Sequence, residues 1–168
     1  MSLRIAVQMD PMEKINVAGD STFAIMLAGQ KRGHSFFHYL APDLSYSDER
    51  VRARARPVEV RDVHGDHFSY GTWQTIDLID EIDVVLMRQD PPFDLGYITA
   101  THLLERIQPH TLVVNDPASV RNAPEKLLVL DYARFMPPTL ITRSLEETRA
   151  FQAKHGEIVV KPLHGFAC

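Results

Sequence analysis

A polar loop stiffened by two prolines, residues 88–94 (RQDPPFD), carries the most informative combination of side chains in the sequence. It follows a short apolar run, residues 83–87, so it stands where a strand is expected to end. An arginine at such a place can bind a carboxylate through two parallel hydrogen bonds, and the prolines restrict the loop before a ligand arrives. Arg88 is therefore a candidate substrate contact. Taken alone, the loop favours the plainer interpretation that Arg88 pairs with Asp90 or Asp94 and that the prolines only end the strand.

Two lysines, Lys126 and Lys161, stand in surroundings that suit a nucleotide. Lys161 ends an apolar run and precedes residues 162–165 (PLHG), where an ammonium group can meet phosphate oxygens while a turn closes over them. Lys126 lies in the segment NAPEK, residues 122–126. A lone lysine is most often a solvated surface residue, so spacing alone leaves the nucleotide site a hypothesis.

Other kinds of site find little support in the sequence. The histidines include no HExxH pattern and the one cysteine, Cys168, has no CxxC partner, so no dedicated metal site is expected. Neither a P-loop nor a GxGxxG pattern occurs. Arginines alternate with small apolar residues over residues 50–56, which could attract anions but is more typical of the solvated face of an edge strand.

Composition limits the class of protein. With 168 residues, 45% of them hydrophobic and 24% charged, the chain has the make-up of a soluble globular protein with one good core. A net charge of −4 makes nucleic acid an unexpected partner. No apolar run approaches the ~20 residues of a membrane span. The start lacks the layout of a signal peptide, and the single cysteine agrees with a reducing compartment, so the cytoplasm is the expected location.

The first half of the chain predicts the elements that position these residues. Residues 3–9 predict a buried strand, residues 20–33 a helix that Asp20-Ser21 can cap, and residues 34–40 a second strand, which together form a βαβ unit. Residues 51–60 alternate as an exposed strand until Pro57 interrupts it. Residues 67–70, after a turn at Gly65, are its candidate antiparallel partner.

Two further strands, residues 83–87 and 112–114, flank a helix predicted at about residues 97–107. The expected fold class is therefore α/β, with an open, mainly parallel sheet flanked by helices and with a hairpin excursion. Ligands collect at the carboxyl ends of the strands of such sheets. Residues 10–11, 88–94 and 115–116 would all lie at that edge.

The chain changes character after Asn122, where a boundary is expected between residues 1–122 and residues 123–168. Residues 124–134 predict a helix that Pro137 and Pro138 end. Ser144 and Glu147 have the spacing of a capping box ahead of another helix. Strands are expected at residues 139–142 and 157–161. The second piece is small for independent folding, so residues 158–160 are expected to be exposed, with self-association or local disorder there.

Five segments, taken in order, resemble the bacterial glutathione synthetase family. They are VQMDP at 7–11, DSTFAIMLAGQKRGH at 20–34, VVLMRQDPPFD at 84–94, VVNDPASVRNAPEKL at 113–127 and IVVKPLHG at 158–165. The resemblance runs almost end to end. The MRxDPPFD pattern is specific to that family, whereas the lysine before an apolar helix and the strand-Lys-Pro pattern are shared across ATP-grasp ligases.

The resemblance implies a Rossmann-like, pre-ATP-grasp substrate domain over residues 1–122 and the start of an ATP-grasp domain over residues 123–168. It implies a homo-oligomeric ligase that uses ATP and Mg²⁺ to convert γ-glutamylcysteine to an acyl phosphate, which the amine of glycine attacks to give glutathione. Lys126 and Lys161 would bind the nucleotide, and Arg88 and Asp90 would bind the substrate.

In the family, a glycine-rich lid, an adenine hinge and the metal ligands come later than the point reached by Cys168, so this polypeptide alone is expected to lack synthetase activity. Two alternatives remain: a non-catalytic binding or assembly module that keeps the substrate domain, or another ATP-grasp ligase that joins a different acid and amine. The reading frame after Cys168 would test the first. Thermal shifts with γ-glutamylcysteine, glutathione and unrelated dipeptides would test the second.

Overall fold

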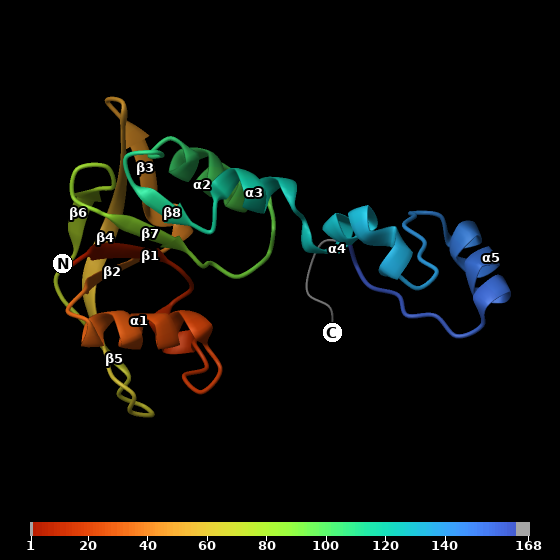
Figure 1. Cartoon of the computed structure of the whole chain (residues 1–168), viewed down its shortest axis with the longest axis horizontal. Helices are drawn as coiled ribbons and strands as arrows, with labels where there is room; N and C mark the ends of the chain where they lie inside the picture. Colours follow the sequence, from red (N-terminus) through yellow and green to blue (C-terminus); the bar gives the residue numbers. More distant parts are fainter. Residues whose placement is uncertain (1, 164–168) are drawn as a thin grey trace. The chain divides into compact units, whose positions relative to one another are not determined.

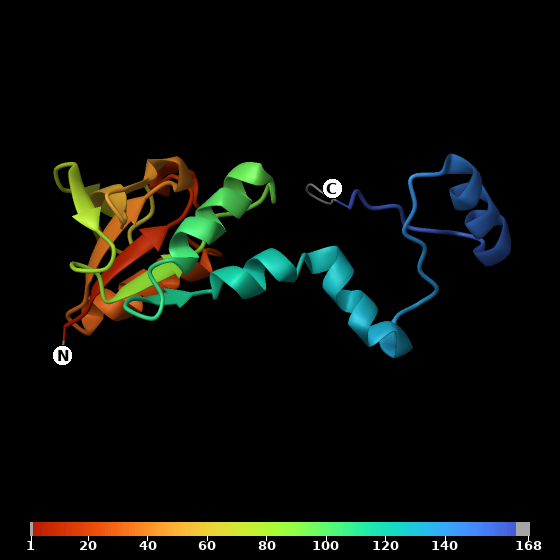
Figure 2. The same ribbon diagram turned by 90° about the horizontal axis from the view of Figure 1, so that it is seen from above.

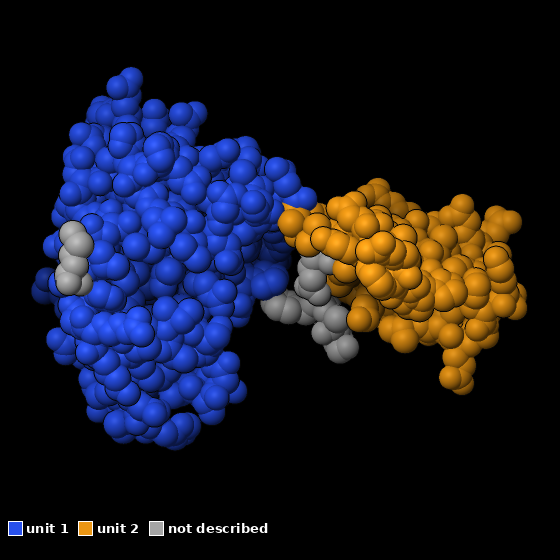
Figure 3. Space-filling model, viewed as in Figure 1, with its two compact units in different colours: residues 1–122 blue, residues 123–168 orange. Residues whose placement is uncertain are grey.

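The computed structural model describes residues 2–163, so the expectations for the turn at Gly165 and for Cys168 lie outside the described residues. The chain divides into two compact units, residues 1–122 and residues 123–168 (Figure 3). Within the described part of the chain, no helix is both long enough and apolar enough to cross a membrane.

The first unit is built on four parallel strands that stand in the order β2, β1, β7, β8. They are β1 (Arg4–Gln8), β2 (Ser35–Tyr39), β7 (Val84–Met87) and β8 (Leu112–Val114). β1 pairs with β2 on one side and with β7 on the other. Its residues after Arg4 are buried because each face of the sheet packs in one of two core clusters. Each of these strands forms where the sequence predicts it.

Helix α1 (Ser21–Lys31) connects β1 to β2 and covers one face of the sheet. It begins at Asp20, whose side chain accepts a hydrogen bond of 2.7 Å from the amide of Phe23. The backbone after the helix turns at Gly33, which has a φ of 82°, a conformation that glycine adopts without strain. The buried Phe23 and Met26 pack in one cluster with alternate residues of β1, β2 and β7.

Helix α2 (Leu95–Glu105) connects β7 to β8 and lies on the opposite side of the sheet from α1 (Figures 1 and 2). It begins two residues before the predicted start, because the Asp94 side chain accepts from the amide of Tyr97 at 2.9 Å and caps the helix there. Leu104 and Ile107 are fully buried in the second core cluster, with the other alternate residues of the sheet. Helix α3 (Pro117–Asn122) follows β8 and packs on α2.

Strand β4 (Arg50–Val60) is continuous through Pro57, so the prediction that this proline interrupts the strand is wrong. Pro57 stands opposite Phe37 in the antiparallel pairing with β2, and its carbonyl accepts from the amide of Gly71 at 2.8 Å. In the first half of β4, the face that carries Val51 is buried in the core cluster that contains Leu104 of α2. In the second half, the opposite face, which carries Val58, is buried in the core cluster that contains Phe23 of α1. The side chains of β4 alternate between the two faces along the whole strand, and the two halves differ only in which face is buried.

Three short strands pair antiparallel with β4: β3 (Leu44–Ser47), β5 (Phe68–Tyr70) and β6 (Gln74–Asp77). Together with the parallel strands they make one eight-stranded mixed sheet within residues 2–163. Two 3₁₀ turns, η1 (Met12–Lys14) and η2 (Ala41–Asp43), follow β1 and β2. The first unit is therefore a mixed α/β structure with helices on both faces of a curved sheet.

The second unit contains α4 (Glu125–Leu128), the 3₁₀ segment η3 (Val129–Phe135) and α5 (Leu145–His155). Ser144 caps α5 by accepting from the amide of Glu147 at 3.3 Å, as its spacing predicts. The single helix predicted over residues 124–134 is instead divided into α4 and η3, and the 3₁₀ segment is kinked at Tyr132.

The two strands predicted at residues 139–142 and 157–161 are wrong, because the backbone there is irregular. A strand needs a neighbour to bond its N–H and C=O groups, and residues 123–163 contain no strand that could supply one. The side chains of Val159 and Val160 are 83% and 75% exposed, as expected for apolar residues without a packing partner in this unit.

Candidate functional site

The loops after β1 and β7 meet at the carboxyl edge of the parallel strands. The amide of Arg88 donates to the carbonyl of Gln8 at 2.8 Å, which continues the pairing of β1 with β7. The amide of Asp90 donates at 2.8 Å to a carboxylate oxygen of Asp10. The expectation that residues 10–11 and 88–94 share one edge is therefore confirmed.

The side chain of Arg88 is held by the first turn of α1. Its Nε donates to the hydroxyl of Thr22 at 3.0 Å, and its Nη2 donates to the hydroxyl of Ser21 at 2.7 Å. The interpretation that Arg88 pairs with Asp90 or Asp94 is wrong, because within residues 2–163 no carboxylate oxygen lies within ion-pair distance of this guanidinium. Two hydroxyl groups fix the guanidinium and leave its charge without a counter-ion among the described residues.

The side chain of Asp90 is exposed at the same edge. Burial raises the pKa of the nearby Tyr97, the negative charge of Asp90 raises it further, and the positive charge of Arg88 opposes this rise. The phenol of Tyr97 is therefore close enough to feel both charges of the loop. Its ring also packs against Phe93, with the ring centroids 5.1 Å apart.

The side chain of Gln8, at the end of β1, contacts Gln89 of this loop. Gln8 is fully buried, and its amide nitrogen donates to the amide oxygen of Gln89. The amide oxygen of Gln8 is buried without a partner in the described part of the chain. Buried amide groups are normally hydrogen-bonded. The contact between Gln8 and Gln89 therefore fixes the loop, but the unpaired oxygen of Gln8 lowers the stability of the folded state.

Asp116, at the end of β8, has a local structural role. Its side chain accepts at 2.7 Å from the amide of Ser119. The side chain of Ser119 and, after it, this amide lower the pKa of the Asp116 carboxyl group. The residue caps α3 at the carboxyl edge of the sheet.

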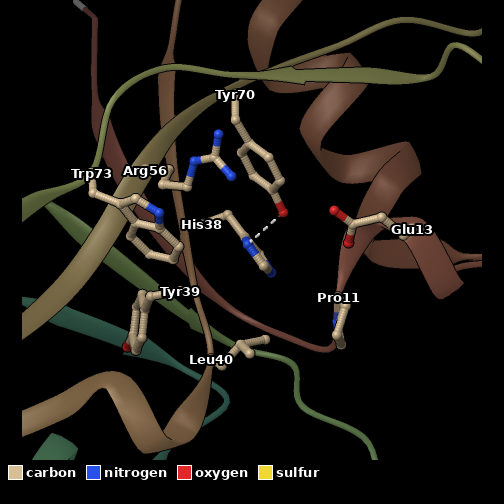
Figure 4. Close-up of a pocket in the computed structure, with 8 residues that line it drawn as sticks. All are labelled: Pro11, Glu13, His38, Tyr39, Leu40, Arg56, Tyr70 and Trp73. Atoms are coloured by element: carbon tan, nitrogen blue, oxygen red, sulfur yellow. Dashed lines mark hydrogen bonds between the residues drawn. The ribbon is translucent and has the colours of Figure 1, made fainter.

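A separate pocket of about 180 Å³ opens beside the loop that follows β1 (Figure 4). It is lined by Pro11, Glu13, His38, Tyr39, Leu40, Arg56, Tyr70 and Trp73. His38 is 5% exposed, and this burial lowers the pKa of its imidazole. The pocket shares no side chain with Arg88, Ser21 and Thr22, which together form the Arg88 cluster.

The two candidate nucleotide-binding lysines both belong to the second unit. Lys126 is half-buried in α4, and Lys161 is exposed in the irregular segment after α5. Nothing in the local structure of either residue specifies a phosphate, so both remain predictions.

Metal ligation finds no candidate among the described residues: residues 2–163 contain no group of three His, Cys, Asp or Glu side chains that could hold an ion.

Sequence reasoning missed Ser21 and Thr22, the two residues whose hydroxyl groups fix Arg88, and it also missed the buried Gln8. The signals were present but weak. Gln8 is the one amide in a mostly apolar run. Ser21 belongs to the predicted capping pair and Thr22 follows it, where hydroxyl side chains are common for local reasons. The parallel pairing of β1 with β7 brings Gln8 beside Arg88, and the position of α1 brings Ser21 and Thr22 to it.

Comparison with known proteins relates both units to one family. Residues 3–121 match the family described as prokaryotic glutathione synthetase, N-terminal domain, and residues 125–168 match prokaryotic glutathione synthetase, ATP-grasp domain. The proteins called glutathione synthetase in Rhodopseudomonas palustris and Bradyrhizobium diazoefficiens are 57% and 58% identical over 165 residues, 98% of this chain. That of Salmonella typhimurium is 40% identical over 164 residues. The chain spans 52% of the length of each of these relatives.

Proposed function

Because the chain belongs to the prokaryotic glutathione synthetase family, we propose that it takes part in the ATP-dependent ligation of γ-glutamylcysteine and glycine to glutathione. In this proposal, residues 1–122 are a Rossmann-like, pre-ATP-grasp substrate domain with a hairpin excursion. Residues 123–168 are the beginning of the ATP-grasp domain. The protein works in the cytoplasm as a homo-oligomer on small molecules, with no nucleic acid or membrane partner.

In the proposed reaction, the γ-phosphoryl group of ATP passes to a carboxylate of γ-glutamylcysteine and ADP leaves. The amine of glycine then attacks the acyl phosphate, inorganic phosphate leaves, and an amide bond forms. Catalysis of this kind depends on positioning and on charge stabilisation. Arg88 and Asp90 belong to the positioning part.

The observation that carries the proposal is the state of the Arg88 guanidinium. A guanidinium has five N–H donors, and Ser21 and Thr22 accept from two of its nitrogens. The remaining donors have no partner among the described residues. An arginine whose orientation is already fixed loses little further side-chain entropy when a carboxylate binds. We infer that Arg88 binds a carboxylate of γ-glutamylcysteine.

Asp90 supplies the opposite charge on the same loop. Its backbone is fixed by Asp10, and its carboxylate is exposed. γ-Glutamylcysteine carries an α-ammonium group beside its α-carboxylate. We infer that Asp90 accepts hydrogen bonds from this ammonium group while Arg88 binds the carboxylate.

Lys126 and Lys161 are proposed to contact the phosphates of ATP. This rests on the match of residues 125–168 to the ATP-grasp domain of the family. Mg²⁺ accompanies ATP in this proposal and would offset phosphate charge. Residues 2–163 contain no group of three His, Cys, Asp or Glu side chains that could hold the ion on its own.

Ligand-dependent thermal unfolding tests the proposal. A ligand present at 100 times its dissociation constant stabilises the native state by about 2.7 kcal/mol. We expect γ-glutamylcysteine to raise the unfolding temperature of the 168-residue protein, and an unrelated neutral dipeptide such as Ala-Ala to leave it unchanged. Equal stabilisation by unrelated dipeptides would favour a ligase with another substrate pair. No stabilisation by any of them would favour a module that does not bind substrate.

A further inference from the structure

The pocket beside the β1 loop combines groups of opposite charge that make no ion pair in the described part of the chain. Figure 4 shows Arg56 and Trp73 on one side of the rings of Tyr70 and His38, and Glu13 on the other side. Neither Arg56 nor Glu13 makes an ion pair within residues 2–163. Unpaired charges of both signs around one cavity are the arrangement that a zwitterion would complement.

The hydrogen bonds of His38 fix the protons on the polar wall. Its Nε2 lies 3.2 Å from the carbonyl oxygen of Asp10, which can only accept, so this nitrogen carries the proton. Its Nδ1 must then accept from the hydroxyl of Tyr70 at 2.8 Å. Burial and, after it, the charge of Glu13 raise the pKa of Tyr70 to about 12, so the phenol keeps its proton at neutral pH. The phenolic oxygen can therefore only accept from a ligand, and the backbone of Met12 already makes one hydrogen bond with it.

Glu13 makes the same side of the pocket attractive to a cation. Its carboxylate faces the Tyr70 hydroxyl (Figure 4), and its charge acts on both Tyr70 and His38. A carboxylate beside a phenolic acceptor is a suitable environment for an ammonium group, which has three donors and no acceptor.

Arg56 supplies the positive charge of the pocket, and its guanidinium is held in a fixed position. Its Nε donates to the carbonyl of Gly71 at 3.1 Å, and its guanidinium carbon lies 4.0 Å from the ring centre of Tyr70 and 5.2 Å from that of Trp73. Two aromatic rings and one backbone carbonyl orient the guanidinium while leaving its terminal nitrogens without a described hydrogen-bond partner. These nitrogens can receive a carboxylate.

We propose that this pocket binds a small α-amino acid as a zwitterion, with its ammonium group on Glu13 and Tyr70 and its carboxylate on Arg56. The volume of about 180 Å³ is below the roughly 300–1,000 Å³ typical of sites for drug-sized ligands, which restricts the ligand to this size class. The exposed indole of Trp73 forms the apolar wall that the side chain of the amino acid contacts. The site is separate from the Arg88 cluster and does not depend on the proposed reaction.

The intrinsic fluorescence of the protein can test this site directly, because Trp73 is the only tryptophan of the chain. Titration of the 168-residue protein with glycine or L-alanine should give a saturable change in fluorescence. Propionate, which lacks the ammonium group, and propylamine, which lacks the carboxylate, should each bind at least tenfold more weakly. No saturable response to either amino acid, or equal responses to the singly charged probes, would overturn the proposal.

Substitutions of the two charged residues test whether the amino acid binds in this pocket. Arg56→Gln and Glu13→Gln should each weaken L-alanine binding at least tenfold, measured by calorimetry because Arg56→Gln also changes the surroundings of the indole. Unaltered binding in folded Arg56→Gln and Glu13→Gln would contradict the assignment. Circular dichroism establishes that each variant is folded.

Two further arginines provide matched controls. The guanidinium of Arg54 lies 4.6 Å from the Trp73 ring centre but does not line the pocket, so Arg54→Gln should leave binding in place. Arg88→Gln should also leave L-alanine binding unchanged, which distinguishes this site from the proposed substrate site. Loss of binding in folded Arg88→Gln would place the amino acid at the Arg88 cluster and overturn the proposal.

Discussion

The guanidinium Nε of Arg88 lies 3.0 Å from the hydroxyl oxygen of Thr22, although 66 residues separate them in the sequence. The contact joins the end of β7 to the first turn of α1 and orients the arginine of the loop after β7, for which the described residues supply no counter-ion. The proposed substrate contact therefore depends on a residue for which the sequence predicts only a place in a helix.

Thr22→Val should separate the orienting role of this hydroxyl from its packing. Thr22 is 4% exposed, and valine keeps its shape but removes the acceptor of Arg88. We expect a loss of about 0.5–1.5 kcal/mol in the free energy of unfolding, the usual net contribution of one hydrogen bond, because the guanidinium of Arg88 is only partly buried. We also expect weaker binding of γ-glutamylcysteine. Urea denaturation and calorimetry measure the two effects.

Thr99→Val is the matched control for that substitution. Thr99 is an exposed threonine whose hydroxyl bonds only to the carbonyl of Leu95 in its own helix. Its replacement should leave ligand binding unchanged. If both variants reduced binding equally, the orienting role of Thr22 would be refuted.

Asp20→Ala should lower the free energy of unfolding by about 1 kcal/mol, because the amide of Phe23 loses its acceptor at the first turn of α1. Asp20→Asn keeps a capping oxygen and should lose much less. Urea denaturation of both variants measures the difference. Equal losses in the two variants would show that charge, and not the capping bond, stabilises this end of the helix.

Gly29→Ala should destabilise the protein, although alanine is the better helix former by about 1 kcal/mol. A Cβ at this position would lie 2.6 Å from the Cζ atom of Phe36, which is 3% exposed and has little room to move. Phe36→Leu should remove much of this clash, so the two substitutions should be non-additive in a double-mutant cycle of unfolding free energies. Strict additivity would show that the two residues do not contact as described.

The free energy of unfolding should fall on acidification, because the folded state disfavours the protonated form of His38. Burial lowers the pKa of His38 below its ordinary value of 6.5, and the carbonyls of Asp10 and Met9 and the charges of Glu13 and Asp43 only partly offset this. The neutral form is favoured on folding, so this contribution is complete above pH 6.5 and is lost as pH falls below it, where the unfolded chain takes up the proton first. Urea denaturation between pH 7.5 and 5.5 should show this slope.

His38→Gln should reduce that slope, because the titrating group is gone. His110→Gln, at an exposed histidine, should leave it unchanged. A slope that is the same in the wild-type protein and in His38→Gln would assign the pH dependence to other groups.

Local patterns predict much of the first unit. Short apolar runs indicate β1, β2, β7 and β8, and Asp20 and Ser144 mark the starts of α1 and α5 because their side chains cap those helices. The interruption predicted at Pro57 is wrong, since a proline can remain in a strand when its missing N–H is not needed for pairing. The course of β4 depends on which helix covers each half, and this is a tertiary property that alternation alone does not contain.

Local patterns predict the second unit less well than the first. The apolar pattern of residues 157–161 predicts a strand, but a strand forms only when another strand accepts its hydrogen bonds. The Arg88 cluster is predictable only in part for a similar reason. The loop and its arginine are visible in the sequence, whereas Ser21, Thr22 and Gln8 become partners only through the position of α1 and the parallel pairing of β1 with β7.

Calorimetric titration of the 168-residue protein with γ-glutamylcysteine, for the wild-type protein, Arg88→Lys and Arg32→Gln, tests the central claim most directly. Lysine keeps the charge but cannot bond two hydroxyl groups and a carboxylate in one plane, so Arg88→Lys should bind at least tenfold more weakly. Arg32 lies exposed at the other end of α1, and its replacement should leave the affinity unchanged. Wild-type affinity in a folded Arg88→Lys protein would contradict the assignment of Arg88 as the substrate contact.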